Sequence, residues 1–251
     1  VGFMPEDPVH VSDAFAENGL EMIGGVVFRA FHDPAQWDDV LDGSKRTCEA
    51  LVAHGAQHLV LIDSISPRRA PTAGRALEAK QMDVAEWAAY VTRFREICKM
   101  GVDHGLTVGI HAHAAGFMDF EPELERLLSE IPEDLLQICF DTGHHSYAGF
   151  DPIAFMEKWI SRISYLHFKD IDPKVKADVI AKRTGFYDAC GQGIFCNLGD
   201  GDVDFSAARQ LLLDNEFQGW CTVEQDCDPT LDVRPVDDAR LNRTYLQSIG
   251  F

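Results

Sequence analysis

Segments typical of strands and segments typical of helices alternate along this chain of 251 residues. Short runs rich in apolar and β-branched residues are each followed by a stretch in which apolar residues recur at helical spacing. Strands are predicted at residues 20–28, 58–65, 107–114, 136–141, 163–171 and 220–226. Helices are predicted at residues 9–18, 34–55, 84–103, 122–129, 152–159, 205–215 and 236–248. No change of composition marks a boundary, so we expect one domain over residues 1–251, with a parallel sheet covered by helices.

The number of strands limits the architecture. Six full strands are predicted, and residues 1–3 resemble the end of another. A closed (β/α)₈ barrel requires eight strands. We therefore expect a (β/α)₈ barrel that lacks part of its N-terminal βα units in this chain, with a doubly wound sheet as the alternative. Residues 172–201 form a long irregular connection in this prediction, which suggests a lid or a site loop.

Charge and cysteine content limit the partners and the compartment. The chain has 41 acidic and 22 basic residues and a formal net charge of −19. This charge argues against binding to nucleic acid or to an anionic membrane, and no apolar run is long enough to span a bilayer. The seven cysteines include no CxxC pair, so we expect no structural zinc site and a reducing, cytoplasmic location.

Side chains that can bind a metal gather at the predicted strand ends. Residues two apart on a strand share a face, and in a barrel the C-terminal strand ends meet at one mouth. The residues concerned are His111 and His113, Asp141, His167 and Lys169, and Glu224 and Asp226. Each has a simpler explanation by itself, such as a helix N-cap for Asp141, but their joint occurrence at four strand ends predicts a metal site. Imidazole and carboxylate ligands together suit Mn²⁺, Co²⁺, Fe²⁺ or Zn²⁺, and Mg²⁺ less well.

Two further groups of residues lie near these strand ends. His144 and His145 follow Asp141 closely, and we expect at least one of them to bind a substrate hydroxyl at the mouth. The three arginines of the loop after the second strand could clamp an anion, although a solvated surface is the simpler expectation for Arg68, Arg69 and Arg75.

Five motifs together resemble the xylose isomerase-like (β/α)₈ superfamily of sugar isomerases, epimerases and dehydratases. They are HAHA at 111–114, FDTGHHSYAGFDP at 140–152, RISYLHFKDI at 162–171, LGDGDVDF at 198–205 and GWCTVEQDCDP at 219–229. They cover the C-terminal half of the chain in the order of the superfamily. Within it, the chain is most similar to the inosose (2-keto-myo-inositol) dehydratases.

The resemblance implies one divalent metal held by four strand-end ligands, with Mn²⁺ or Co²⁺ expected first. Position by position, it implies His111, Asp141, His167 and Glu224. The superfamily usually has a glutamate at the first position, whereas the HxH pair here is similar to that of the inosose dehydratases, and either His111 or His113 could be the ligand.

The resemblance also implies the chemistry, which is removal of a proton next to a ketone. The metal acts as a Lewis acid on the resulting enediolate, and His113 or Glu224 is the candidate base. In a dehydratase, Lys169 or a histidine would then protonate the departing β-hydroxyl. His144 matches the substrate-binding histidine of the superfamily, and we expect His145, Lys169 and Asp226 to contact substrate as well.

The expected function is therefore dehydration of a keto-cyclitol or keto-sugar by a metal-dependent lyase. Alternatives are a sugar isomerase or epimerase and a lyase that cleaves a 3-keto-glycoside. A metal-dependent DNA-repair nuclease would need a basic groove, which the charge opposes, and a noncatalytic sugar-binding subunit is the remaining class. We also expect a homo-oligomer, since barrels of this kind often associate, although the phenylalanine-rich loops could equally line the pocket.

Overall fold

A single curled sheet of parallel strands forms the centre of the chain. The computed structural model describes residues 8–226 and 235–251, so the strand end expected at residues 1–3 lies outside the described residues. The sheet has the order β1-β2-β3-β4-β5-β8, and all of its neighbouring strands are parallel. Its strands are β1 (Gly24–Arg29), β2 (His58–Asp63), β3 (Thr107–Ile110), β4 (Gln137–Asp141), β5 (Ile163–Phe168) and β8 (Trp220–Val223).

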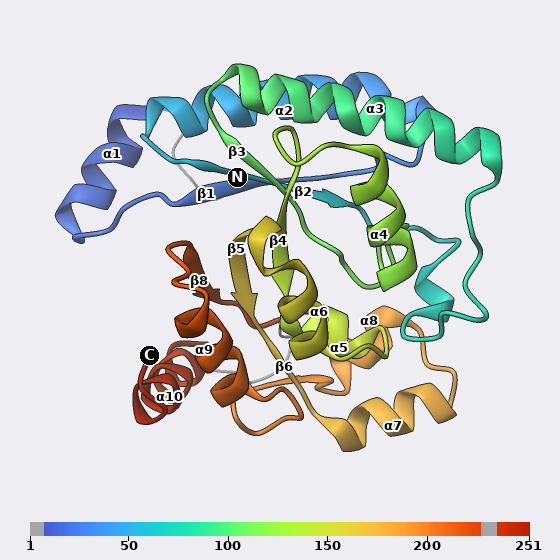
Figure 1. The fold of residues 1–251 in the computed structure, drawn as a ribbon, viewed down its shortest axis with the longest axis vertical. Helices are drawn as coiled ribbons and strands as arrows, with labels where there is room; N and C mark the ends of the chain where they lie inside the picture. Colours follow the sequence, from blue (N-terminus) through green and yellow to red (C-terminus); the bar gives the residue numbers. More distant parts are fainter. Residues whose placement is uncertain (1–7, 227–234) are drawn as a thin grey trace.

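The strand order follows the chain without reversal. A doubly wound sheet would reverse its order at a switch point, so that alternative is wrong. The sheet curls with its helices on the outside (Figure 1), which is the partial (β/α)₈ barrel predicted from the sequence.

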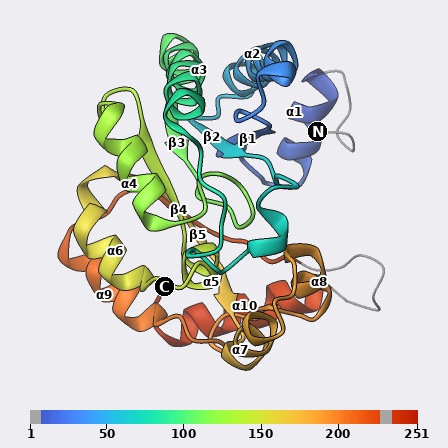
Figure 2. The same ribbon diagram turned by 90° about the vertical axis from the view of Figure 1, so that its right-hand side faces the viewer.

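The helices form an outer layer around the convex face of the sheet, as the turned view makes clear (Figure 2). The longer ones are α1 (Pro8–Glu17), α2 (Trp37–Ala53), α3 (Val84–Asp103), α4 (Glu121–Glu130), α6 (Pro152–Trp159), α9 (Phe205–Asp214) and α10 (Pro235–Ser248). Side chains that cap the first turn fix several helix starts, since Asp83, Asp151 and Asp204 each accept backbone N–H groups. None of the helices in the described ranges has both the length and the apolar composition needed to cross a bilayer.

Alternation along the strands separates the core from the barrel interior. On β2, Leu59 and Leu61 belong to the large core shared with the helices, whereas Val60 and Ile62 pack with Cys139 of β4 and Tyr165 of β5 in a separate cluster. Two residues further along β4 and β5 lie Asp141 and His167. These side chains therefore share the interior face at the C-terminal end of the sheet.

The observed strands end earlier than the sequence predicts. β3 ends at Ile110 and β8 at Val223, so His111 and Glu224 directly follow their strands. The hydrogen bonding continues for one residue, since His111 N donates to Leu61 O and Glu224 N to Phe168 O. The backbone is thus fixed at the residues that carry the site.

The connection at residues 172–201 is more regular than predicted. It contains α7 (Pro173–Ala181), α8 (Phe186–Gly191) and β7 (Phe195–Cys196), which pairs antiparallel with β6 (Asp170–Ile171). The connection at residues 172–201 is called the excursion below. The buried carboxylate of Asp170 accepts the N–H groups of Gly199, Gly201 and Val203 and holds the end of the excursion against the barrel. Phe186 and Phe195 pack on the ring of His144, so the excursion covers the mouth.

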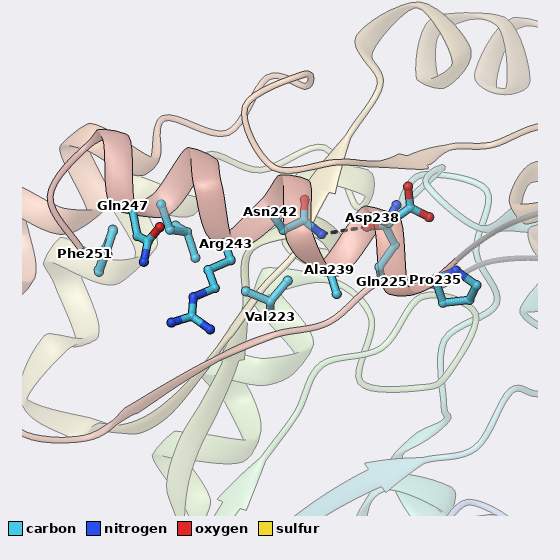
Figure 3. A pocket seen from close by; sticks show the side chains of 10 residues that line it. Val223, Gln225, Pro235, Asp238, Ala239, Asn242, Arg243, Gln247 and Phe251 are labelled. Carbon is cyan, nitrogen blue, oxygen red and sulfur yellow. Dashed lines mark hydrogen bonds between the residues drawn. The ribbon is translucent and has the colours of Figure 1, made fainter.

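A cavity of about 510 Å³ lies between α10 and the outer side of β8 (Figure 3). Val223 and Gln225 line it, and they alternate with Glu224, so the cavity is on the opposite side of the strand from the barrel interior. The amide of Asn242 donates to Gln225 Oε1 and accepts from Leu198 N. These bonds tie α10 to the residue that follows Glu224 and to Leu198 in the loop before α9.

Candidate metal centre

Four strand-end side chains converge in the barrel interior. They are His111, Asp141, His167 and Glu224, and one potential ligand atom from each lies within 4.8 Å of the corresponding atoms of the others. His111 Nε2 is 3.4 Å from Asp141 Oδ2 and 3.9 Å from Glu224 Oε2. His167 Nδ1 is 3.0 Å from Glu224 Oε2 and 4.0 Å from Asp141 Oδ2. Ligands about 2.1 Å from a single ion would show separations of this size.

These same four atoms are buried without a hydrogen bond. His111 Nε2, Asp141 Oδ2, His167 Nδ1 and Glu224 Oε2 form no well-aligned hydrogen bond, and the charged groups nearest to them are one another and Lys169 Nζ. An ion at their common centre would bind all four. The donor set therefore fits a divalent metal ion.

The two carboxylate oxygens of Asp141 have different surroundings. Oδ1 accepts the N–H of His144 at 2.7 Å and caps the short helix α5 (Thr142–Tyr147), while Oδ2 faces the metal centre. The N-cap explanation suggested by the sequence is thus correct for Oδ1, and Oδ2 is left to face the other candidate ligands. The cap also fixes the carboxylate plane.

Lys169 adds a buried ammonium beside the metal ligands. Only 1% of the residue is exposed, and Nζ lies 3.0 Å from Asp226 Oδ2, 3.2 Å from Glu224 Oε2 and 3.5 Å from Asp141 Oδ2. Its aliphatic chain needs the glycine at position 143, because a Cβ there would lie 2.6 Å from Lys169 Cγ.

Mutual charge compensation sets the protonation of the centre. Burial by itself would lower the pKa of His111, but Asp141 and Glu224 raise this pKa to about 9. Burial opposes ionisation of Asp141, yet Lys169 and His111 keep its pKa below the usual value, and the pKa of Glu224 is lowered against burial by His111 and His167. The pKa of Lys169 is raised, against burial, by the surrounding carboxylates. Both acids are therefore in the anionic form that binds a metal.

His113 lies beside the ligands as a neutral ring. Its Nδ1 is 2.9 Å from the carbonyl oxygen of Ala114, which can only accept, so Nδ1 carries the hydrogen and Nε2 keeps a free lone pair. Burial, followed by the charges of His111 and Lys169, lowers the pKa of His113 to about 3. The ring centroids of His111 and His113 are 5.9 Å apart.

His144 stands between His113 and Lys169. Its Nδ1 accepts the N–H of Ala114, so the neutral ring carries its hydrogen on Nε2, which lies 3.0 Å from Lys169 Nζ. With Lys169 as an ammonium, both nitrogens of this contact carry hydrogen, so it is a close approach and not a hydrogen bond between a donor and an acceptor. Burial and Lys169 hold the pKa of His144 well below its usual value. His144 is therefore a neutral ring that turns its Nε2 toward Lys169.

The sequence model of the xylose isomerase-like TIM barrel family matches residues 3–249. The chain belongs to this family. The resemblance stated from the five motifs is confirmed.

Two curated relatives of this xylose isomerase-like chain are inosose dehydratases. The inosose dehydratase of Erwinia tasmaniensis is 29% identical over 247 residues, which are 97% of this chain and 82% of that protein. The inosose dehydratase of Clostridium botulinum is also 29% identical, over 162 residues, and that match spans 64% of this chain and about half (54%) of the relative.

Solved structures of the same fold support the architecture. The IOLI protein with a bound zinc atom superposes with a TM-score of 0.72 at 11% identity, covering 97% of this chain and 81% of that one. The probable 3-DHS dehydratase AsbF from Bacillus anthracis gives a TM-score of 0.71 at 16% identity, with 94% and 80% covered. At these identities the likeness shows the fold alone.

Some predicted site residues lie elsewhere in this xylose isomerase-like barrel. The buried ring of His145 packs between Phe140 and Phe155, and its Nε2 is 3.4 Å from Glu121 Oε2, so the structure does not bring it to the centre. The expectation that the loop arginines are solvated is wrong for Arg69, whose fully buried guanidinium forms two hydrogen bonds with Glu123.

Arg75 is also largely buried and donates to the backbone carbonyl of Thr184, and Arg183 binds Glu78 through both guanidinium nitrogens. These bonds join the loop after β2 to the excursion over the mouth. The arginines are therefore structural ties between the two segments that cover the site.

Asp119 is a buried carboxylate near the site that is not among the residues predicted from the sequence. This buried carboxylate accepts the N–H of Ala115 through Oδ2, and its Oδ1 has no hydrogen bond. Burial raises its pKa to about 7, with the charge of Glu123 adding to the effect and Arg69 opposing it. No local pattern marks this residue, because its burial depends on the packing of the loop after β3.

The first prediction concerns metal content. Wild-type protein loaded with Mn²⁺ and desalted should retain about one ion per chain by elemental analysis, whereas His167→Ala and Glu224→Gln should retain much less, because each removes one of four ligands. His145→Gln, a matched change of a buried histidine outside the centre, should retain the wild-type amount. Equal metal content in all four proteins would show that these side chains do not hold the ion.

The second prediction concerns stability and pH. Because the folded-state pKa of Asp119, about 7, lies above the value of about 4 expected for the unfolded chain, the folded state loses stability as the pH rises from 4 through 7. Asp119→Asn cannot ionise, so it should gain stability relative to wild type over this window, by up to about 4 kcal/mol at pH 8. Urea unfolding at pH 4.5 and 8 measures the difference, and an equal difference at both values would contradict the assignment.

Proposed function

We propose that this chain is a metal-dependent carbon–oxygen lyase that dehydrates a keto-cyclitol or keto-sugar, acting as an inosose dehydratase does. The observation that carries the proposal is the group of four buried, unsatisfied ligand atoms next to a neutral His113 and a buried Lys169. The names of the curated relatives support the same substrate class.

His111, Asp141, His167 and Glu224 would hold the ion, with His111 rather than His113 as the ligand, because it is Nε2 of His111 that lies among the other three ligand atoms. When bound, the ion supplies Lewis-acid polarisation of the substrate carbonyl. Two imidazoles and two carboxylates suit Mn²⁺ or Co²⁺, and we propose these ahead of Zn²⁺, Fe²⁺ and Mg²⁺.

His113 is the base in this proposal. The free lone pair on Nε2 takes the proton from the carbon next to the ketone, and the Ala114 carbonyl stabilises the imidazolium through Nδ1–H. Glu224 is the weaker candidate, since Oε2 belongs to the metal centre.

Lys169 is the acid. Its ammonium gives a proton to the departing β-hydroxyl, which leaves as water, and Asp226 Oδ2 accepts from Nζ at 3.0 Å. The double bond forms between the carbon that lost the proton and the carbon that lost the hydroxyl. The reaction therefore releases one water and needs no other reactant.

The interior face of β1 and β2 is apolar and suits the carbon–hydrogen face of a cyclic substrate. In the parallel register Val26 and Phe28 stand opposite Val60 and Ile62 and share their interior face. Phe28 is 38% exposed and its ring centroid is 5.2 Å from that of His113. A cyclic polyol ketone can place carbon–hydrogen bonds against this ring and its oxygens toward the metal ligands.

The cellular location and the self-association of the chain are also part of the proposal. The six cysteines in the described part of the chain are all free thiols, which supports a reducing, cytoplasmic location. Self-association into a homo-oligomer also remains a prediction, to be measured by light scattering.

The third prediction tests the reaction. Metal-loaded protein incubated with 2-keto-myo-inositol should produce the ultraviolet absorbance of a conjugated product, and His113→Asn should lower kcat by about 10²- to 10⁴-fold, as expected for loss of a general base. His104→Asn, a change at the end of α3, should leave the rate unchanged. If the wild-type protein instead exchanges solvent deuterium into a ketohexose and forms no conjugated product, the isomerase or epimerase alternative replaces the dehydratase.

A further inference from the structure

The loop after β3 connects His113 to a buried carboxylate through a single peptide unit. The carbonyl of Ala114 accepts Nδ1–H of His113, and the N–H of the same peptide unit, which belongs to Ala115, donates to Asp119 Oδ2 at 2.9 Å. The peptide plane is therefore held at both ends. A carboxylate acting on the N–H polarises the peptide and strengthens its carbonyl as an acceptor.

The backbone at this peptide is strained. Ala115 has a φ of 70° although it is not glycine, and it is fully buried. This left-handed conformation costs about 1–2 kcal/mol for an L-residue. It persists because Asp119 binds the N–H of Ala115 and Ser66 N donates to its carbonyl oxygen at 3.0 Å.

The same turn also orients the second histidine. The N–H of Ala114 donates to Nδ1 of His144, so the two backbone groups of one residue set the hydrogen positions on both rings. If the turn relaxed, His113 would lose the partner that fixes its tautomer. The free lone pair on Nε2 would then be present only part of the time.

We propose that Asp119 is a positioning residue, which holds the Ala114–Ala115 peptide so that His113 keeps its hydrogen on Nδ1 and presents Nε2 as the base. This role rests on the proposed function only because His113 is taken there as the base. The tautomer itself is a property of the folded chain. Asp119 acts by accepting the N–H of Ala115 at Oδ2, so the amide oxygen of an asparagine at this position should serve the same purpose.

Histidine ¹⁵N NMR of the metal-free protein tests the proposal without any activity measurement. The His113 signals, assigned by their loss in His113→Asn, should show one tautomer with hydrogen on Nδ1 in wild type and in Asp119→Asn. In Asp119→Ala they should shift toward the average of two tautomers. Asp119→Leu, which fills the same space with apolar atoms, should behave like Asp119→Ala and replaces it if that variant does not fold.

Kinetics give the second readout. Asp119→Ala should lower kcat at least ~10-fold, as expected for a misplaced base, with KM changed less than about twofold, while Asp119→Asn stays near wild type. Asp151→Ala, which removes a carboxylate from backbone N–H groups at the start of α6, should change neither kcat nor the His113 signals.

Wild-type His113 signals in Asp119→Ala or Asp119→Leu would overturn the proposal, as would an Asp119→Asn variant that matches Asp119→Ala. Failure of the proposed function would look different. In that case 2-keto-myo-inositol is not dehydrated by the wild-type protein, while the NMR differences among the Asp119 variants remain.

Discussion

Four buried polar atoms without hydrogen bonds define this molecule more than any other feature. His111 Nε2, Asp141 Oδ2, His167 Nδ1 and Glu224 Oε2 lie together in the barrel interior. Without an ion they are balanced only by one another and by the ammonium of Lys169, an arrangement that the rest of the fold must support. A divalent ion at their centre would bind all four, so that binding of the ion and stability of the folded chain would be coupled.

The sheet brings these atoms together by register and alternation. β3, β4, β5 and β8 are consecutive in the sheet, and each contributes one ligand at or directly after its C-terminal end. The β4–β5 register places Asp141 directly beside His167. A curled sheet of six strands is therefore enough to bring the four candidate ligands together. The excursion between β5 and α9 covers part of the mouth, with Phe186 and Phe195 against His144.

The parts of this arrangement that depend on local sequence could be predicted. A strand has a side-chain period of two, so the sequence alone places His111, Asp141, His167 and Glu224 on one face at strand ends, and the helices follow from their caps and apolar spacing. The remaining features depend on contacts between distant segments. Arg69 is buried because Glu123, 54 residues away, binds it, and Asp119 and His145 owe their surroundings to loop packing that no local pattern encodes. The helices within residues 172–201 were missed because polar and glycine-rich flanks obscure their apolar spacing.

An anomalous-scattering map from crystals grown with Mn²⁺ or Co²⁺ tests the central claim most directly. We expect one peak in the barrel interior, about 2.0–2.3 Å from His111 Nε2, Asp141 Oδ2, His167 Nδ1 and Glu224 Oε2. A fully loaded crystal with no peak there, or with its peak outside this group of four atoms, would contradict the account.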